Sequence, residues 1–268
     1  MVKEIPSMFR MRKWYADCVA ADGTAVVAYW ARLNWGLLRL KYAATLLLKD
    51  GIVSEAATLR AGEEPRAGPE SISWSCSRLG VAGQWRPLDP PVERTLLASD
   101  EGRVEWSCLV PRGHGRVTLA DGSQIEGLGY VERLDLTVRP WRLPIRELRW
   151  GRFLSDGASV VWIEWRGTRP LTILNVNGLE VAGADVGNSG VAWSTGRVEL
   201  EPGAVLRKGA LGATALARVA FVKLLSPRGV RELHESKRVC AGRLVTRDGA
   251  IEMGWAIDEV VRFGGQNG

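Results

Sequence analysis

Glu132 is the residue whose setting in the sequence most clearly suggests proton chemistry. The segment 130–138 alternates between two faces, and Glu132 falls on the apolar face together with Tyr130 and Leu134. A carboxyl group on such a face must either pair with a cation or remain protonated, because an isolated buried charge is costly. A protonated carboxyl in an apolar cavity is a candidate general acid. The alternatives are a structural ion pair and a glutamate at a solvated barrel rim.

Arg152 and Tyr130 are the expected companions of this carboxyl group. A two-residue turn at Asp156-Gly157 would place Arg149 opposite Glu164, which leaves Arg152 without a cross-strand partner. A guanidinium close to the carboxyl would stabilise its ionised form, and the group would then be a base or a structural anion. Tyr130 is expected to donate a hydrogen bond at the same site.

Tryptophan is unusually abundant among the aromatic residues, with 12 Trp against 4 Tyr and 4 Phe. Its ring can line an apolar cavity, and the face of the ring can stabilise a positive charge. The alternative is that these rings only fill the core. The candidate ligand-binding residues are Tyr15, Trp30, Trp150, Trp162, Trp165 and Trp255.

The sequence contains none of the motifs that hold a metal or an organic cofactor. The four cysteines lie far apart and form no CxxC pair, and His114 and His234 are isolated from each other. A phosphate-binding loop, a dinucleotide fingerprint and a nucleophile elbow are all missing. We therefore expect no metal site and no cofactor.

Turn dipeptides containing glycine are the strongest structural signal in the chain. They occur at Asp22-Gly23, Asp50-Gly51, Asp121-Gly122, Asp156-Gly157, Asn177-Gly178 and Asp248-Gly249. Such dipeptides favour type I′ turns, in which both central residues have positive φ, and β-rich segments flank each of them. This pattern is typical of an antiparallel all-β protein. The segment 213–225 fits either a helix or a buried strand.

Two-residue turns would also fix which side chains share a face. In the first hairpin they place Trp14 with Tyr29 on one face and Tyr15 with Trp30 on the other. The other expected cross-strand pairs are Trp162 with Gly151, Trp255 with Gly242, and Arg238 with Glu259.

The chain is long enough for two β units. Polar, turn-rich stretches at 61–71 and 183–190 fall at similar places in its two halves. We expect two consecutive antiparallel lipocalin-like (calycin) β-barrels packed together, with the first over residues 1–126 and the second over 127–268. Closed barrels would leave few exposed strand edges.

Composition limits the partners. The formal charge is +6, from 36 basic and 30 acidic residues, but no basic block occurs and no nucleic-acid partner is expected. No apolar run approaches the roughly 18 residues of a membrane span, so stable membrane insertion is not expected. The N-terminal residues lack the apolar core of a secretory signal, which favours a cytoplasmic location. Homo-oligomerisation stays open.

The order of several short motifs resembles that of a known superfamily. The relevant segments are 127–133 (GLGYVER), 148–153 (LRWGRF), 13–15 (KWY) and 254–259 (GWAIDE). They are similar to motifs of the lipocalin-like superfamily that includes hydroxyneurosporene synthase (a carotenoid hydratase), tocopherol cyclase and AttH-type proteins. Glu132 stands where that superfamily usually has Asp, and Arg133 where it often has His.

This resemblance implies two lipocalin-type barrels, an apolar pocket, and proton-driven chemistry on isoprenoid double bonds without a metal or organic cofactor. Together with the residues above, it predicts binding of a hydrophobic, isoprenoid- or polyketide-like small molecule. Hydration, cyclisation or isomerisation would follow, with Glu132 as the acid and Trp150 facing a cation. A non-catalytic lipid or pigment carrier, and an interaction protein with an aromatic and basic surface, remain alternatives.

Overall fold

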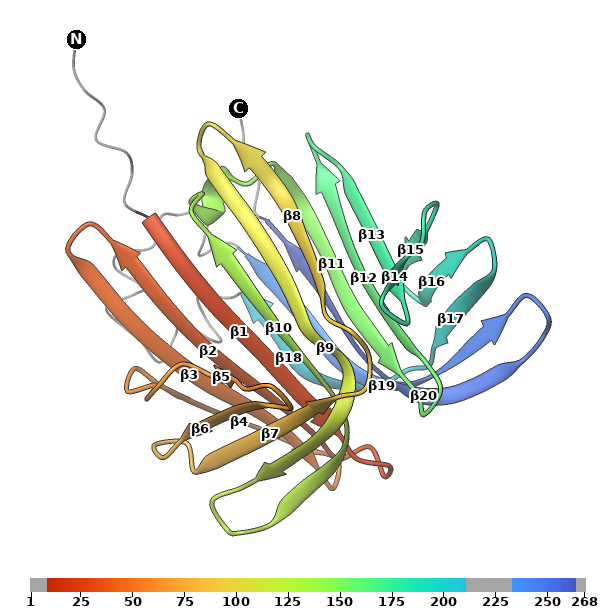
Figure 1. Ribbon diagram of the computed structural model, residues 1–268, viewed down its shortest axis with the longest axis horizontal. Coiled ribbons are helices and arrows are strands. Elements are labelled where there is room, and N and C mark those ends of the chain that lie inside the picture. The colour runs from red at the N-terminus through yellow and green to blue at the C-terminus, as the bar shows by residue number, and fades with distance from the viewer. Residues whose placement is uncertain (1–8, 211–232, 264–268) are drawn as a thin grey trace.

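The computed structural model describes residues 9–210 and 233–263. Its strands form two antiparallel sheets of ten strands each, which lie side by side (Figure 1). The segment 213–225, for which the sequence left helix and strand open, lies outside the described residues. No helix in the described ranges is long and apolar enough to cross a membrane.

The first sheet uses the chain from Phe9 to Leu136, and the second begins at Ile145. The first contains β1 (Phe9–Val19), β2 (Ala25–Trp35), β3 (Leu38–Lys49), β4 (Ile52–Thr58), β5 (Arg66–Ala67), β6 (Ile72–Cys76), β7 (Val81–Pro87), β8 (Val92–Ser99), β9 (Gly102–Thr118) and β10 (Gln124–Leu136). The second contains β11 (Ile145–Leu154), β12 (Ser159–Gly167), β13 (Leu171–Val176), β14 (Leu179–Glu180), β15 (Asp185–Gly187), β16 (Gly190–Trp193), β17 (Gly196–Leu200), β18 (Ala204–Ala210), β19 (His234–Thr246) and β20 (Ile251–Arg262).

The two sheets repeat one topology. The first runs in the order β4-β3-β2-β1-β10-β9-β7-β6-β5, and the second has the same order with every strand number raised by ten. The expected all-β fold of two antiparallel, lipocalin-like units is therefore confirmed. The short 3-10 helix η1 (Pro140–Arg142) lies between the sheets in the chain. The division expected after Glu126 falls inside β10, which pairs with β1 and stays in the first sheet.

Three of the glycine turns have the two-residue geometry expected of them. Asp50-Gly51 and Asn177-Gly178 have positive φ at both residues, as a type I′ turn requires. The turn at Asp156-Gly157 pairs Arg149 with Glu164 and Gly151 with Trp162, as predicted.

The other three turns are one residue longer than predicted. In the first, Ala20 donates its backbone N–H to Thr24 O at 2.9 Å, so three residues form the loop. Asp22 accepts the Thr24 N–H at 2.9 Å, and only Gly23 has positive φ. The loops that contain Asp121-Gly122 and Asp248-Gly249 close in the same way. A type I turn followed by one left-handed glycine accounts for this geometry.

The longer loops shift the pairing of the two strands in each hairpin by one residue. Residues predicted to share a face across the hairpin therefore lie on opposite faces. Each shift corrects a predicted pair, because side chains alternate with a period of two. Trp14 now pairs with Trp30, Tyr15 with Tyr29, Lys237 with Glu259, Arg238 with Asp258, and Trp255 with Ala241.

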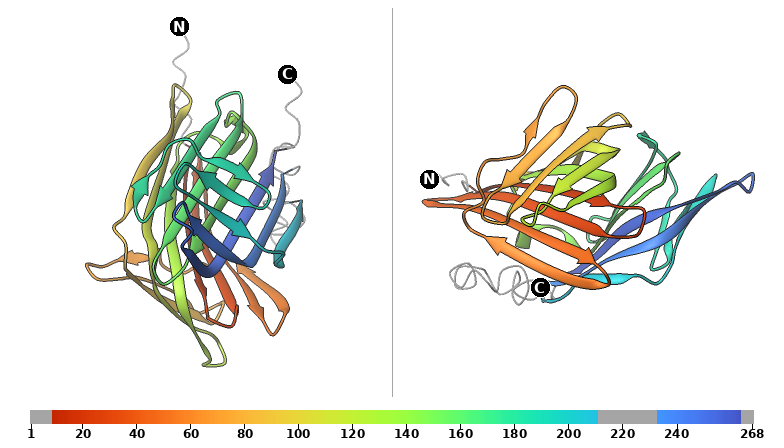
Figure 2. Two further views of the ribbon diagram at one scale, coloured as in Figure 1. Left: turned by 90° about the vertical axis from the view of Figure 1, so that its right-hand side faces the viewer. Right: turned by 90° about the horizontal axis from the view of Figure 1, so that it is seen from below.

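Hydrophobic residues gather in three cores. One lies inside the curve of the first sheet around Trp30 and Trp85, and another inside the second around Trp162 and Phe153. The largest, called here the inter-sheet core, contains buried residues of both sheets, including Tyr15 and Trp150. Figure 2 shows the two curved sheets packed against each other.

A fully buried ion pair joins the sheets within this core. Arg152 of β11 donates to both carboxylate oxygens of Asp17 on β1, at 2.7 and 3.2 Å. Its remaining terminal nitrogen donates to Trp255 O on β20 at 2.7 Å. Both side chains have no exposed surface. The bidentate geometry offsets the large cost of taking two charges out of water.

Replacing one partner of this pair should be strongly destabilising. We expect Asp17→Asn to lower the free energy of unfolding by about 3–5 kcal/mol, because it leaves the Arg152 charge buried without its counter-charge. Urea denaturation measures the change. The matched control is Glu126→Gln, in which the exposed pair with Arg116 is lost at a cost of about 1 kcal/mol or less. Equal effects of the two substitutions would contradict the importance of the buried pair.

Candidate functional site

Glu132 lies at the edge of the inter-sheet core and is held by three donors. Trp106 Nε1, the Tyr130 hydroxyl and Trp150 Nε1 all donate to Glu132 Oε2, at 2.6, 2.7 and 3.1 Å. Trp106 and Tyr130 belong to the first sheet and Trp150 to the second. The carboxylate therefore links the two halves of the chain.

These donors fix the orientation of the Glu132 carboxyl group. All three bind the same oxygen, Oε2, and the hydrogen bonds found among the described residues include none to the other oxygen, Oε1.

A backbone irregularity lies at this point of β10. Its register against β9 shifts on both sides of Val131, between Gly129 and Glu132. Such bulges bend a strand and re-aim its side chains. Tyr130 packs in the inter-sheet core, whereas Val131 faces the interior of the first sheet.

Aromatic rings cover the carboxylate on the inter-sheet side. The Tyr15 ring centroid lies 4.9 Å from that of Trp150, 5.4 Å from Tyr29 and 6.0 Å from Tyr130. The Tyr130 and Trp150 centroids are 5.6 Å apart, and all four pairs meet edge to face. This geometry is favourable for aromatic pairs. We call Tyr15, Tyr29, Trp106, Tyr130 and Trp150 the aromatic cluster.

Lys237 of β19 places an ammonium group against this cluster. Its Nζ lies 4.7 Å from the Tyr15 centroid, 5.1 Å from Trp150 and 5.4 Å from Tyr29. The side chain is fully buried and pairs with Glu259 at 2.6 Å. Burial alone would lower the pKa of Lys237, but Glu259 and the surrounding groups raise it overall, so the residue remains a cation.

Further charged groups surround the Lys237–Glu259 pair. Arg207 of β18 binds Glu55 of the first sheet at 2.7 Å and lies 3.5 Å from Glu235. Burial, reinforced by Glu259, raises the pKa of Glu235. Burial is the largest influence on the pKa of Glu259 and would raise it, but attraction to Lys237 and Lys13 together with hydrogen bonds lowers that pKa to about 2.

The tyrosine hydroxyls of the cluster stay protonated. Burial is the largest cause that raises the pKa of Tyr15, Tyr29 and Tyr130 well above the ordinary tyrosine value. The Tyr130 hydroxyl donates to Glu132, as noted above. The Tyr29 hydroxyl is buried and has no hydrogen-bond partner among the described residues.

The predicted site residues fall into separate environments. Tyr15, Tyr130, Glu132 and Trp150 lie together, and Trp165 is buried in the same inter-sheet core. The remaining candidates lie as follows: Trp30 in the core of the first sheet, Trp162 in that of the second, and Trp255 partly exposed against Gly23.

Arg152 does not pair with Glu132. Its guanidinium binds Asp17, which the sequence analysis did not connect with it. Asp17 lies on the inter-sheet face of β1, two residues from Tyr15, and the packing of the second sheet brings Arg152 of β11 against it. Arg152 therefore contributes to the site by holding the two sheets together.

Three polar groups of the site escaped the sequence analysis: Trp106, Lys237 and Glu259. The Lys237–Glu259 pair would have been found if the turn at Asp248-Gly249 had been taken as a three-residue loop, because that register places the two residues opposite each other. No local signal marks Trp106, which reaches Glu132 from a neighbouring strand.

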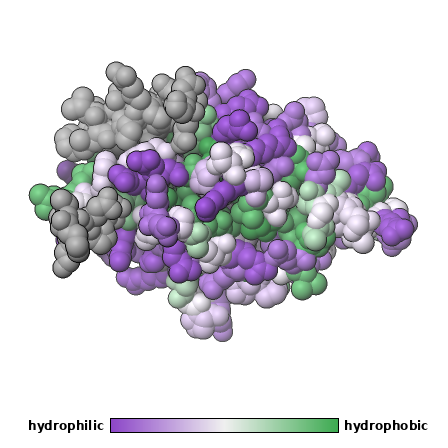
Figure 3. Space-filling view, turned by 90° about the horizontal axis from the view of Figure 1, so that it is seen from above, coloured by the Kyte–Doolittle hydropathy of each residue, from purple (hydrophilic) through white to green (hydrophobic). Residues whose placement is uncertain are grey.

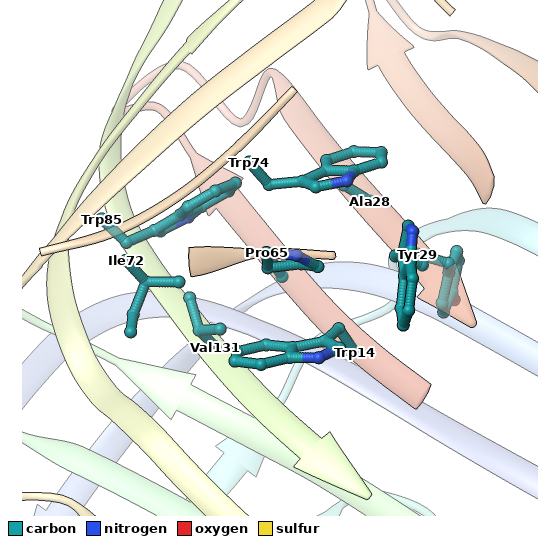
Figure 4. A pocket seen from close by; sticks show the side chains of 10 residues that line it. Trp14, Ala28, Tyr29, Pro65, Ile72, Trp74, Trp85 and Val131 are labelled. Carbon is teal, nitrogen blue, oxygen red and sulfur yellow. The ribbon is translucent and has the colours of Figure 1, made fainter. Parts of the chain in front are cut away.

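A second candidate site is a small cavity inside the first sheet. Figure 4 shows Trp14, Trp74 and Trp85 around it. Its volume is about 10 Å³, which is room for one water molecule. The indole nitrogens of Trp30 and Trp74 are buried here without a partner among the described residues. The cavity is too small for an organic ligand.

The described residues contain no group of three or more His, Cys, Asp or Glu side chains that could hold a metal ion.

Partly buried hydrophobic residues pack against the inter-sheet core, among them Leu134, Leu148 and Leu171. On the face of the molecule seen in Figure 3, a hydrophobic band lies between hydrophilic regions. Apolar surface is thus available on the molecule as well as in its interior.

No family model matches the chain, and the curated proteins contain no match to it. Solved structures do match. A putative AttH from Nitrosomonas europaea aligns with a TM-score of 0.54 at 11% identity, over 93% of this chain and 92% of that one. Kievitone hydratase from Nectria haematococca aligns with a TM-score of 0.54 at 8% identity, over 96% and 90%. CghA, solved with Sch210972, gives 0.56 at 11% identity, over 96% and 89%. These similarities show a shared fold.

Glu259→Gln should destabilise the protein most at neutral pH and less in acid. A carboxyl whose folded-state pKa is lowered contributes stability above its unfolded pKa, and this contribution is lost as the pH falls towards the folded value. For Glu259 that window runs from the usual 4.5 down to about 2. The difference in free energy of unfolding between wild type and variant should shrink across it. Urea denaturation at a series of pH values measures this, and a constant difference would contradict the role of the Lys237 pair.

Proposed function

We propose that the protein binds a hydrophobic small molecule at the aromatic cluster and transfers a proton on it, with Glu132 as the base. The observation that carries this proposal is the Glu132 carboxylate: Trp106, Tyr130 and Trp150 hold one oxygen, and no hydrogen bond from residues 9–210 or 233–263 is found on the other. The aromatic rings supply apolar contact area, and the carboxylate supplies a proton acceptor beside it.

This proposal changes the role that the sequence suggested for Glu132. A general base needs a carboxyl oxygen that can meet the proton of the ligand. The three donors hold Oε2, so Oε1 is the atom proposed to take the proton. Abstraction of a proton by Oε1 would start an isomerisation or cyclisation. Tyr130 keeps Glu132 oriented, and Arg152 acts by positioning β11 against β1.

The proposed ligand is isoprenoid- or polyketide-like. The resemblance of the motifs to hydroxyneurosporene synthase and tocopherol cyclase supports an isoprenoid. One structural neighbour is by name a hydratase of kievitone, and another was solved with Sch210972, which supports a small-molecule ligand.

A non-catalytic carrier is the second candidate. It is favoured by the ion pairs of Lys237 with Glu259 and of Arg152 with Asp17, which occupy charged groups that could otherwise take part in chemistry. Native mass spectrometry of the freshly purified protein would identify a co-purifying compound. Retention of that compound without conversion over time would favour the carrier, and conversion would favour the enzyme.

Glu132→Gln should abolish most turnover while preserving the fold. The amide oxygen can still accept the hydrogen bonds of Trp106, Tyr130 and Trp150, but it cannot take up a proton. We expect a loss of about 10²- to 10⁴-fold in kcat, the usual contribution of a general base. The measurement is conversion of a panel of polyenes, prenylquinones and polyketides, followed by mass spectrometry.

The matched control is Glu126→Gln, on the same strand but exposed, which should convert the panel at the wild-type rate. Turnover by Glu132→Gln equal to that of the control would remove Glu132 from the reaction. If none of the proteins converts any compound but wild type retains one, the chain is a carrier.

A further inference from the structure

We propose that Lys237 fixes the charge of the ligand: the site takes a hydrophobic molecule bearing an uncharged or anionic oxygen acceptor and excludes a hydrophobic cation. This inference rests on the proposed function, because it concerns the ligand of the same aromatic cluster. It departs from the expectation that Trp150 faces a cation formed on the substrate. Lys237 is the specificity-determining residue.

The aromatic rings that could face a ligand cation are already occupied by the cation of the chain itself. Lys237 Nζ lies within 4.7 to 5.4 Å of the ring centroids of Tyr15, Trp150 and Tyr29. These distances lie inside the range of a cation–π interaction, which is strongest when the cation is shielded from water. Lys237 has no exposed surface. A ligand cation would have to displace this ammonium group or lie next to it.

Tyr29 is the residue that would meet the oxygen acceptor. Its hydroxyl is buried without a partner among the described residues, so it has an unused donor, and a buried unused donor is costly. Lys13, Arg207 and Lys237 all carry their charge 5.4 to 5.5 Å from the Tyr29 ring centroid. Three positive charges this close to the ring favour an acceptor with partial or full negative charge.

The carboxylates of the same region do not offer a substitute site for a ligand cation. Glu259 binds Lys237 at 2.6 Å, and Glu55 binds Arg207 at 2.7 Å. Glu235 lies 3.5 Å from Arg207 and within hydrogen-bonding reach of Glu259. Each of these three carboxylates is already paired with a cation of the chain. Around Lys237, the hydroxyls of Tyr15 and Tyr29 are buried donors without a hydrogen-bond partner among the described residues.

A set of ligands with one skeleton and three charges tests the inference. The probes are acetylnaphthalene, which carries a neutral carbonyl acceptor, naphthoate, and naphthyltrimethylammonium. Isothermal titration calorimetry measures the dissociation constant of each probe with the full-length wild-type chain. We expect both oxygen-bearing probes to bind at least about tenfold more tightly than the ammonium probe, which corresponds to about 1.4 kcal/mol.

Two variants identify the residues responsible. Lys237→Met removes the charge at similar length and should bring the three dissociation constants together, because the rings then become open to the ammonium probe. Lys208→Met, an exposed lysine of β18, is the matched control and should behave as wild type. Tyr29→Phe removes only the unpartnered hydroxyl; it should weaken the oxygen-bearing probes and leave the ammonium probe unchanged.

The outcomes separate this inference from the function it rests on. If the ammonium probe binds wild type as tightly as the other two, the inference is overturned while hydrophobic binding stands. If no probe binds, the proposed binding function is wrong, and so is the inference that rests on it. If Lys237→Met does not fold, the wild-type protein and the Tyr29→Phe variant still test the inference. Tyr29→Phe that prefers the oxygen-bearing probes as strongly as wild type would show that Tyr29 is not the donor.

Discussion

The ion pair between Asp17 and Arg152 is the constraint on which the arrangement of the two sheets depends. It lies wholly inside the inter-sheet core and also ties β20 through the Trp255 carbonyl. An apolar contact between two curved sheets could slide, because dispersion and hydrophobic burial have little directionality. A bidentate ion pair at 2.7 Å cannot slide without leaving both charges unpaired. The sheets are therefore held in one relative position.

The site owes its geometry to that position. Glu132 receives donors from both sheets, and Lys237 of the second sheet reaches Tyr15 and Tyr29 of the first. Neither half could form these contacts alone. The repeated topology places the equivalent strands β1 and β11 near the middle of each sheet. These two strands carry Tyr15 and Trp150, so the site forms where the two sheets meet.

The charge distribution gives the site its chemical character. Glu132 is held by three neutral donors, whereas Lys237 is stabilised as a cation by Glu259 and three aromatic rings. Trp150 contacts both groups, through its indole nitrogen and through its ring face. The proposed base and a fixed positive charge in one cluster would suit a reaction in which negative charge develops on a substrate oxygen.

The sequence by itself determined the fold class, the turn positions and the alternation of each strand, because hairpin turns and side-chain periodicity are local properties. It also brought Tyr130 and Glu132 to one face and placed Arg149 opposite Glu164. It did not determine the length of three turns. At Asp22-Gly23 the same residues suit a two-residue turn with positive φ at Asp22, or a three-residue loop in which the Asp22 carboxylate accepts the Thr24 N–H. One residue of difference there moved Trp30 from the face of Tyr15 to the face of Trp14. The partners Asp17–Arg152, Lys237–Glu259 and Trp106–Glu132 were decided by the tertiary structure, because only packing and cross-strand register bring these groups together.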